Sequence, residues 1–384
     1  IAMRDRFLLD KSITFLNHGS CGATPRVVFD VYQKWQMTLE NQPVELLGRR
    51  YRDLMAQSRA ELGNYLGTSG DNLVYTTNVT EALNIVAHSL CLGPGDEVLG
   101  TNHEYGAIDR MWRFLSKECG YKYINQSIPL SVNEEEFLEI FWEGVNSRTK
   151  VISISHITSP TALIFPIHAV VQRARKQGLV TIIDGAHAPG QIPLNLDDLN
   201  VDFYGGNLHK WLCAPKGTGF LFANPCAQEL LKPHTVSWGY EAEIPGPNLF
   251  VDHHEWTGTR DISSFLTVPA AIAFQEENKW ENIRTSCRDL IFQVQKRIGS
   301  LLGETPIGRI NGILQMIAIP LPTQTNPGQL QSDLYTLFKI EVPVYKWSNI
   351  NIIRVSIQGY NTQEDVDKLL YALKVLLLEG KSDK

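Results

Sequence analysis

The sequence predicts an α/β fold in which helices cover a mostly parallel sheet and a smaller α+β domain follows it. Short apolar runs alternate with helical patterns between about residues 71 and 223, which is typical of such a sheet. After about residue 270 a long charged helical stretch precedes well-separated strands, which indicates the second domain. With 384 residues, the chain is long enough for one large core and a smaller one.

The individual elements follow from the spacing of apolar residues and from the turns between them. Unbroken apolar runs predict buried strands, and apolar residues at helical spacing predict helices. Pro94-Gly95 and Pro189-Gly190 mark two connections. In the large domain we expect strands at residues 72–76, 97–100, 150–155, 179–184 and 219–222, with helices at 81–91 and 167–176. In the second domain we expect a helix at 270–302, strands at 314–319 and 352–357, and a closing amphipathic helix at 363–378.

Composition favours small molecules as partners. With 43% hydrophobic and 20% charged residues, the chain is neither disordered nor fibrous. The formal net charge is only -6 and the basic residues are scattered, so neither nucleic acid nor a membrane surface is expected as a partner. The six cysteines form no C-x-x-C pair, which predicts neither a metal site nor a disulfide framework. Because the chain lacks an apolar run long enough to span a membrane and a signal-peptide pattern, we expect a cytoplasmic protein.

Two segments combine a carboxylate and a lysine at the ends of apolar runs. One run stops at Asp184, as a buried parallel strand does when its carboxyl end opens on a ligand crevice. A second apolar stretch leads to Lys210. Alone, Asp184 could close a turn and Lys210 could be a solvated surface lysine. As a pair they suggest a pyridoxal phosphate site, because a lysine amine can hold the cofactor aldehyde and a carboxylate can keep its pyridine nitrogen protonated.

The segment after the first predicted strand has hydroxyl and amide side chains where a helix begins. Unpaired amides and the positive end of the helix dipole favour a phosphate there, and Thr80 could add a hydroxyl donor. Plain N-capping by Thr77, Asn78 or Thr80 is the alternative interpretation. Asn207 and His209 precede Lys210 directly and could donate to the same phosphate.

His103 and a cluster of aromatic residues are further candidates. The His103 imidazole follows a short predicted strand, where it could lie on the pyridine ring, move a proton, or belong to a surface loop. Aromatic and histidine side chains between Trp238 and Trp256 fall in a Pro- and Gly-rich stretch. They could line a pocket for a large substrate side chain or pack at a subunit interface.

Together these motifs resemble the class V branch of the fold-type I pyridoxal phosphate enzymes, and most of all the isopenicillin N epimerase-like proteins. The resemblance covers nearly the whole chain. It implies a large domain at residues 26–270, with a mostly parallel seven-stranded sheet and helices on both faces, and a small α+β domain from residues 1–25 and 271–384. Its most specific motifs are residues 17–22, 78–81, 184–190, 206–212, 258–260 and 354–362.

The resemblance implies a role for each candidate residue. Lys210 would bind pyridoxal 5'-phosphate as a Schiff base, Asp184 would pair with the pyridine nitrogen, and His103 would stack on the ring. Arg354 would bind the substrate α-carboxylate through its planar fork. The remaining residues would be Ala186 below the ring, His187 and Ser159 near the phenolic oxygen, Asn78, Val79, Thr80, Asn207 and His209 at the phosphate, and Asn17 and His18 beside the substrate. Thr259 would reach the phosphate from a second subunit of a homodimer.

The reaction implied is removal of the α-proton of an amino acid, with Lys210 as the main base. Epimerisation needs a second acid on the opposite face, which could be His18, Tyr105 or water. A cysteine or cystine C-S lyase acting by β-elimination and a class V aminotransferase would use the same residues and stay open. Persulfide-forming desulfuration is not expected, because residues 340–350 lack the nucleophilic cysteine that it needs. Because the lysine and Arg354 are both present, a non-enzymatic binding protein is disfavoured.

Overall fold

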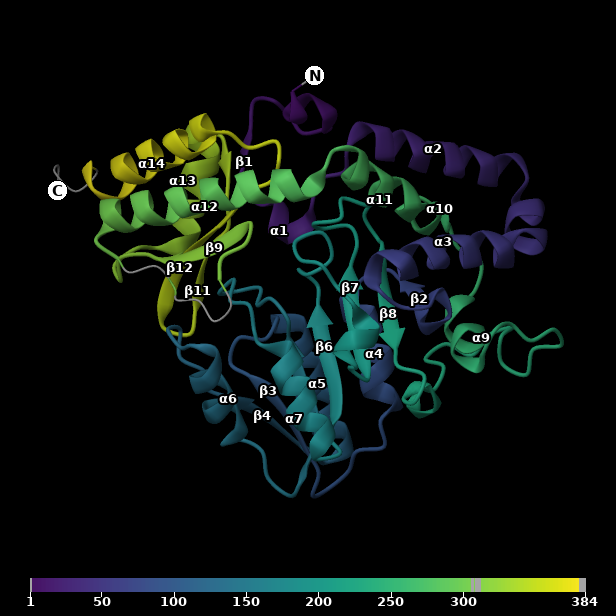
Figure 1. The fold of residues 1–384 in the computed structure, drawn as a ribbon. Coiled ribbons are helices and arrows are strands. Elements are labelled where there is room, and N and C mark those ends of the chain that lie inside the picture. The colour runs from purple at the N-terminus through teal and green to yellow at the C-terminus, as the bar shows by residue number, and fades with distance from the viewer. Residues whose placement is uncertain (1, 305–306, 308–311, 380–384) are drawn as a thin grey trace.

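A seven-stranded sheet forms the centre of the larger part of the fold (Figure 1). The computed structural model describes residues 2–304, 307 and 312–379. The strand order is β2-β8-β7-β6-β5-β3-β4; β8 is antiparallel to both neighbours and the other pairs are parallel. The strands are β2 (Leu73–Thr76), β3 (Glu97–Thr101), β4 (Lys122–Gln126), β5 (Thr149–Ser155), β6 (Val180–Gly185), β7 (Phe203–Asn207) and β8 (Gly219–Ala223). The predicted mostly parallel seven-stranded sheet is thus confirmed.

Helices cover both faces of this sheet. Successive side chains of a strand point to opposite faces, and Ile182 and Ile183 of β6 accordingly belong to two different apolar clusters. On the Ile182 face the sheet packs against α4 (Val79–Ser89), α5 (Gly106–Cys119) and α9 (Leu249–Glu255). On the Ile183 face it packs against α2 (Arg26–Asn41), α3 (Tyr51–Leu66), α6 (Glu134–Trp142), α7 (Ile167–Lys176), α10 (Ser263–Leu266) and α11 (Val268–Glu277).

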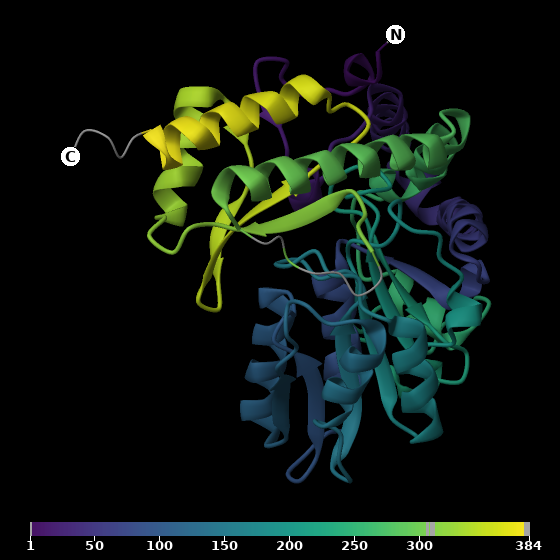
Figure 2. The same cartoon turned by 60° about the vertical axis from the view of Figure 1, so that its left-hand side comes forward.

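The C-terminal part forms a separate layer beside the large sheet (Figure 2). A three-stranded antiparallel sheet has the order β11-β12-β9, and helices α12, α13 and α14 pack together over it. The N-terminal strand β1 pairs in parallel with β10, which joins the start of the chain to this part. The elements are β1 (Thr14–Phe15), β9 (Met316–Pro320), β10 (Ile340–Glu341), β11 (Val344–Trp347), β12 (Ile350–Ser356), α12 (Trp280–Leu302), α13 (Pro327–Phe338) and α14 (Gln363–Leu377).

Several elements of the fold differ from the sequence prediction. The single helix expected at residues 270–302 is two helices, α11 and α12, separated at Lys279, which has a left-handed backbone with φ 49°. No proline or glycine marks that break, so the pattern could not reveal it. Strands β4 and β7 of the large sheet were also missed; in β7, Gly205 and Gly206 weaken the strand signal. A side chain at Gly206 would collide with the Phe220 ring of β8, so the close approach of the two strands requires glycine.

The sheet topology brings four strand ends to one edge. Strands β2, β5, β6 and β7 run in the same direction, and their last residues include Thr76, Ser155, Asp184 and Asn207. The segment of α1 (His18–Cys21) lies over this edge. At Gly22 φ is 72° and a side chain would collide with the backbone of His209, so only glycine lets the segment lie so close to the lysine.

Candidate active site

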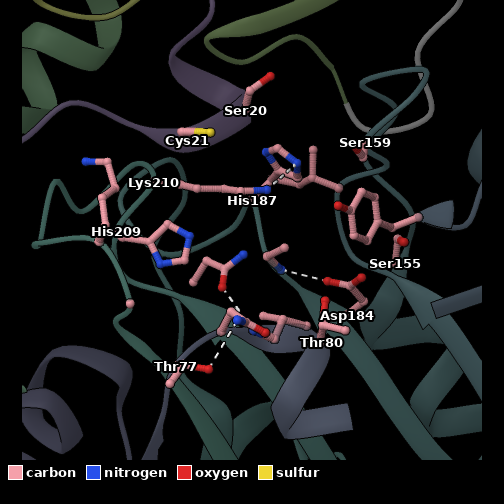
Figure 3. A pocket seen from close by; sticks show the side chains of 18 residues that line it. Ser20, Cys21, Thr77, Thr80, Ser155, Ser159, Asp184, His187, His209 and Lys210 are labelled. Atoms are coloured by element: carbon pink, nitrogen blue, oxygen red, sulfur yellow. Dashed lines mark hydrogen bonds between the residues drawn. The ribbon is translucent and has the colours of Figure 1, made fainter. Parts of the chain in front are cut away.

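A cavity of about 500 Å³ opens at this edge of the sheet, which is where ligands bind in open α/β folds. In Figure 3, Ser20 and Cys21 lie on one side of it, Thr77 and Thr80 lie on the other, and Lys210 points toward His187. The cavity brings together ten of the residues predicted from the sequence, which are Asn78, Val79, Thr80, Ser159, Asp184, Ala186, His187, Asn207, His209 and Lys210.

Asp184 is a buried carboxylate at the end of β6. Its Oδ1 accepts a hydrogen bond of 2.9 Å from the Ala186 backbone N–H. Burial raises the pKa of Asp184, while the Ala186 amide and the charge of Lys210 act in the opposite direction. No arginine or lysine among the described residues forms an ion pair with it. A protonated pyridine nitrogen would supply the counter-ion that this carboxylate lacks.

Lys210 reaches into the cavity with its amine 3.2 Å from Nε2 of His187. Burial, and then the positive charge of Arg354, lower the pKa of Lys210 to about 8, against the opposing effect of Asp184 and Cys21. An amine with such a pKa has a substantial unprotonated fraction near neutral pH. It therefore suits attack on an aldehyde better than an ordinary lysine does.

The start of α4 forms the opposite end of the cavity. Asn78 caps the helix, since its Oδ1 accepts from the Glu81 N–H at 3.0 Å. Asn207 Oδ1 accepts from the Val79 N–H at 3.0 Å, and Asn207 lines the cavity. The helix dipole and the first-turn amides at Thr80 make this end suited to a phosphate.

His209 lies beside the same end, and its Nδ1 is bonded to the Thr218 carbonyl at 2.9 Å. Burial and the neighbouring Lys210 charge lower the pKa of His209 to about 4. A phosphate dianion would favour the charged form and so offset this effect. The carboxylate, the amine and the helix start therefore fit the three reactive parts of pyridoxal phosphate.

Arg354, on β12, is a buried cation behind the cavity wall. Its Nη1 donates to the backbone carbonyl and hydroxyl of Ser159 at 2.7 and 3.0 Å, and its Nη2 donates to Ser20 Oγ at 2.9 Å. Among the described residues, its Nε has no hydrogen-bond partner and no carboxylate forms an ion pair with it. Burial lowers the pKa of Arg354. Ser159, expected near the phenolic oxygen, is thus seen as a partner of the arginine.

The structure does not bring His103 to the cavity, contrary to the role expected for it. The imidazole is fully buried between Phe165 and Trp347, with Nδ1 bonded to Thr161 Oγ1 and Nε2 to a backbone carbonyl, each at 2.8 Å. The aromatic side chain that does line the cavity from this loop is Tyr105, which is 46% exposed.

Besides His103 and Arg354, three further predicted residues lie outside the cavity lining. His18 is fully buried, with Nδ1 bonded to Tyr360 and Nε2 bonded to the Lys210 carbonyl, so it supports the lysine backbone and does not face substrate. Asn17 accepts a hydrogen bond from Ser20, which itself accepts one from Arg354. Asn17 therefore contacts a partner of the arginine and does not line the cavity. Thr259 is exposed on the surface, away from this cavity.

Cavity-lining residues that the sequence did not single out include Ser20, Cys21, Ser155 and Lys216. Ser20 and Cys21 fall within the motif at residues 17–22, so a signal for them was present. Ser155 ends β5 and donates to the buried Glu104 at 2.7 Å. Its position follows from the strand register, in which it pairs with Asp184, and not from any local pattern.

Comparison with known proteins decides the family. The family model described as Aminotransferase class-V matches residues 14–369. The chain belongs to the class V aminotransferase family. This family depends on pyridoxal phosphate, so the protein is a pyridoxal phosphate enzyme, in agreement with the prediction from Asp184 and Lys210.

The names of the individual relatives denote two different activities. The chain is 34% identical to the isopenicillin N epimerases of Amycolatopsis lactamdurans and Streptomyces clavuligerus, over 97% of this chain and 97% of each relative. It is 28% identical to a putative L-cysteine desulfhydrase of Oryza sativa, over 97% of this chain and 84% of that one. A solved structure of a C-DES mutant, with glycine covalently linked to its cofactor, has a TM-score of 0.85 at 20% identity and covers 97% of this chain and 99% of that one. At 20% identity, this similarity shows that the two proteins share a fold and says nothing more.

The pKa of Lys210 predicts how cofactor uptake by this class V enzyme depends on pH. Because only the unprotonated amine attacks an aldehyde, the uptake rate of the cofactor-free protein should rise with pH and level off above about 8. An ordinary lysine titrates about two units higher. The rate of appearance of visible absorption, followed at pH values on both sides of 8, measures the midpoint. A midpoint at the ordinary lysine value would show that the amine is not perturbed.

Proposed function

We propose that this protein is an amino-acid epimerase of the isopenicillin N epimerase type, which uses pyridoxal phosphate to remove and return the α-proton of its substrate. The observation that carries the proposal is the buried guanidinium of Arg354, which has an unpartnered Nε and lies beside the cavity through Ser20 and Ser159. Such a cation is stable in the interior when an anion joins it, and the α-carboxylate of an amino acid fits its fork. The two epimerases at 34% identity support the choice of reaction.

The side chains divide the work of proton transfer. When bound, the cofactor withdraws electrons from the α-carbon and so lowers the cost of losing its proton. Arg354 fixes the carboxylate, which orients the α-carbon toward Nζ of Lys210. Lys210 then takes the proton at Nζ. Inversion requires a second group on the opposite face, and Tyr105 is the candidate, since it lines the cavity whereas His18 is sealed behind the lysine.

Replacing Tyr105 with phenylalanine separates proton removal from inversion. The Tyr105→Phe variant keeps the ring but loses the hydroxyl that would protonate the opposite face. We expect epimerisation to fall by about 10²–10⁴-fold, the usual contribution of a positioned acid, while Lys210 still exchanges the α-proton of one enantiomer. Solvent deuterium incorporation and optical purity, measured on the same samples, give the two rates.

The matched control is Cys21→Ser, which changes another titratable side chain in the cavity lining. Inversion should persist in that variant. Loss of inversion in Cys21→Ser, together with normal inversion in Tyr105→Phe, would assign the second acid to the thiol and contradict the role of Tyr105.

A second candidate reaction is β-elimination by a cysteine or cystine C-S lyase. The observation that favours it is the similarity to proteins named L-cysteine desulfhydrase from Oryza sativa and Arabidopsis thaliana, at 25 to 28% identity. Both reactions begin with loss of the α-proton, so Lys210 and Arg354 serve either one. Release of pyruvate and ammonia with sulfide from cysteine, or with cysteine persulfide from cystine, without inversion of other amino acids, would identify the lyase.

We further propose that the enzyme acts as a homodimer in a reducing compartment such as the cytoplasm. Exposed apolar side chains gather between residues 236 and 249, with Trp238 85% exposed, and such a patch is typical of a protein interface. Thr259, also exposed, follows this segment and would reach the phosphate of a second subunit. All six cysteines are unpaired thiols. Over the described ranges, no helix has the length and apolar character needed to cross a membrane.

A further inference from the structure

Trp211, the residue after the cofactor lysine, makes a hydrogen bond that fixes where a neighbouring histidine holds its proton. The indole is fully buried, and its Nε1–H donates to Nδ1 of His187 at 3.2 Å. An indole N–H can only donate. Nδ1 of His187 must therefore accept, which it can do only when it carries no proton.

The other ring nitrogen of His187 faces Lys210. A neutral imidazole with an unprotonated Nδ1 carries its proton on Nε2. That nitrogen lies 3.2 Å from the Lys210 amine. An ammonium group offers three donors and no acceptor, so it cannot accept a hydrogen bond from Nε2–H, whereas an uncharged amine can. The contact thus matches a neutral His187 beside a neutral Lys210.

The charges around the two groups act in the same direction. Burial, and then the charges of Lys210, Arg354, His18 and His209, hold the pKa of His187 well below its usual range. For Lys210, burial and Arg354 lower the pKa, and Asp184 and Cys21 raise it. Burial and the neighbouring positive charges both disfavour the imidazolium form of His187. The hydrogen bonds of the neutral ring therefore determine which of its nitrogens carries the proton.

We propose that Trp211 is a positioning residue that holds His187 in its Nε2–H form, so that a hydrogen-bond donor points into the cavity beside the amine of Lys210. This donor favours the uncharged, nucleophilic form of the lysine before the cofactor binds. It also presents an N–H to an anionic oxygen of a bound cofactor. The inference rests on the proposed function and deepens it, since it explains how the lysine is made ready.

The tautomer can be read directly in the cofactor-free protein by NMR of ¹⁵N-labelled histidine. The chain has 10 histidines, and the His187 signals are identified by their loss in His187→Asn. In the wild-type protein we expect a protonated Nε2 and an unprotonated Nδ1. A protonated Nδ1 in the wild-type protein would overturn the proposal, whatever the variants do.

Trp211→Phe removes the donor and keeps an aromatic ring. Without the indole N–H, we expect the Nδ1–H form to become populated, because Nε2 can then accept from the Lys210 ammonium. The pH midpoint for labelling of Lys210 by an amine reagent, followed on its peptide, should rise by about one unit, a tenfold change in the acid equilibrium. If neither the His187 tautomer nor the Lys210 labelling midpoint changed in Trp211→Phe, the proposal would be contradicted.

The matched control is Trp112→Phe. Trp112 is also fully buried and also donates one indole hydrogen bond, at 2.9 Å, but to the hydroxyl of Ser153. Its loss should leave the His187 signals and the Lys210 midpoint unchanged. A shift in both variants would mean that loss of core packing causes the effect. Because both measurements use the protein without cofactor or substrate, they stand even if the enzyme proves to be a lyase or a transaminase.

Discussion

Replacing Lys210 with alanine is expected to abolish the visible absorption of the lysine-bound cofactor and to reduce turnover by at least about 10⁴-fold, the upper range for loss of a positioned base. The reason is that one amine serves both as the covalent attachment point and as the base for the α-proton. The variant should still take up pyridoxal phosphate, because Asp184 and the start of α4 are intact. Absorption spectra before and after borohydride treatment, with peptide mass analysis, measure the attachment.

Lys216→Ala is the control for this experiment, because Lys216 lines the same cavity and carries the same functional group. Its amine lies 3.3 Å from the Thr24 hydroxyl. This variant should keep the absorption band and a borohydride-stable mass increase on Lys210. If the band survived in Lys210→Ala and vanished in Lys216→Ala, the assignment of the cofactor lysine would be wrong.

Replacing Arg354 with glutamine is expected to lower kcat/KM for amino acids by about 10²–10⁴-fold, since two charge-assisted hydrogen bonds contribute about 1.5–3 kcal/mol each. Most of the loss should fall on KM, because the guanidinium binds the carboxylate in the ground state as well as in the transition state. The folded state should not be weakened, since the substitution removes a buried cation that no described carboxylate pairs with.

The sharpest control uses a substrate without the group that Arg354 is proposed to bind. An amine that lacks the α-carboxylate should be exchanged slowly, and equally slowly, by the wild-type enzyme and by Arg354→Gln. Arg297→Gln removes an exposed arginine that pairs with Asp367, and it should behave as the wild type does. An equal loss for carboxylate and non-carboxylate substrates in Arg354→Gln would contradict carboxylate binding.

The parts of the site that could be predicted from the sequence are those set by strand ends. Asp184 and Lys210 follow apolar runs, and the carboxyl ends of parallel strands meet at one edge of a sheet whatever the rest of the fold does. The start of α4 could be predicted for the same reason, because the polar residues after β2 lie at that edge and cap the helix. The family assignment rests on these same segments, and the comparisons confirm it.

The residues that the structure does not bring to the cavity lining are those whose direction is set by distant partners. His103 and Tyr105 belong to one loop, but Thr161 holds the imidazole away from the cavity, whereas Tyr105 stands at the start of α5 and stays half exposed. His18 is turned inward by Tyr360, which lies 342 positions further along the chain. Local patterns identify the loop that borders a site. They do not show which of its side chains another segment will hold.

The hydrogen bond between Trp211 and His187 could not be predicted from the sequence either. The position of Trp211 next to Lys210 is evident in the sequence, but its hydrogen bond to His187 depends on how the loop after β6 packs against the loop after β7. The buried Arg354 is similar, because its missing counter-ion becomes visible only when its neighbours Ser20 and Ser159 are in place. What the structure adds is therefore mainly the pairing of side chains across segments.

The measurement that tests the central claim most directly is incubation of the cofactor-loaded enzyme with a panel of amino acids in heavy water, followed by analysis of deuterium content and optical purity. The account predicts α-deuteration of at least one amino acid together with formation of its opposite configuration, without any requirement for a 2-oxo acid. Absence of α-deuteration across the panel, or exchange that occurs only with transfer of the amino group to a 2-oxo acid, would contradict it.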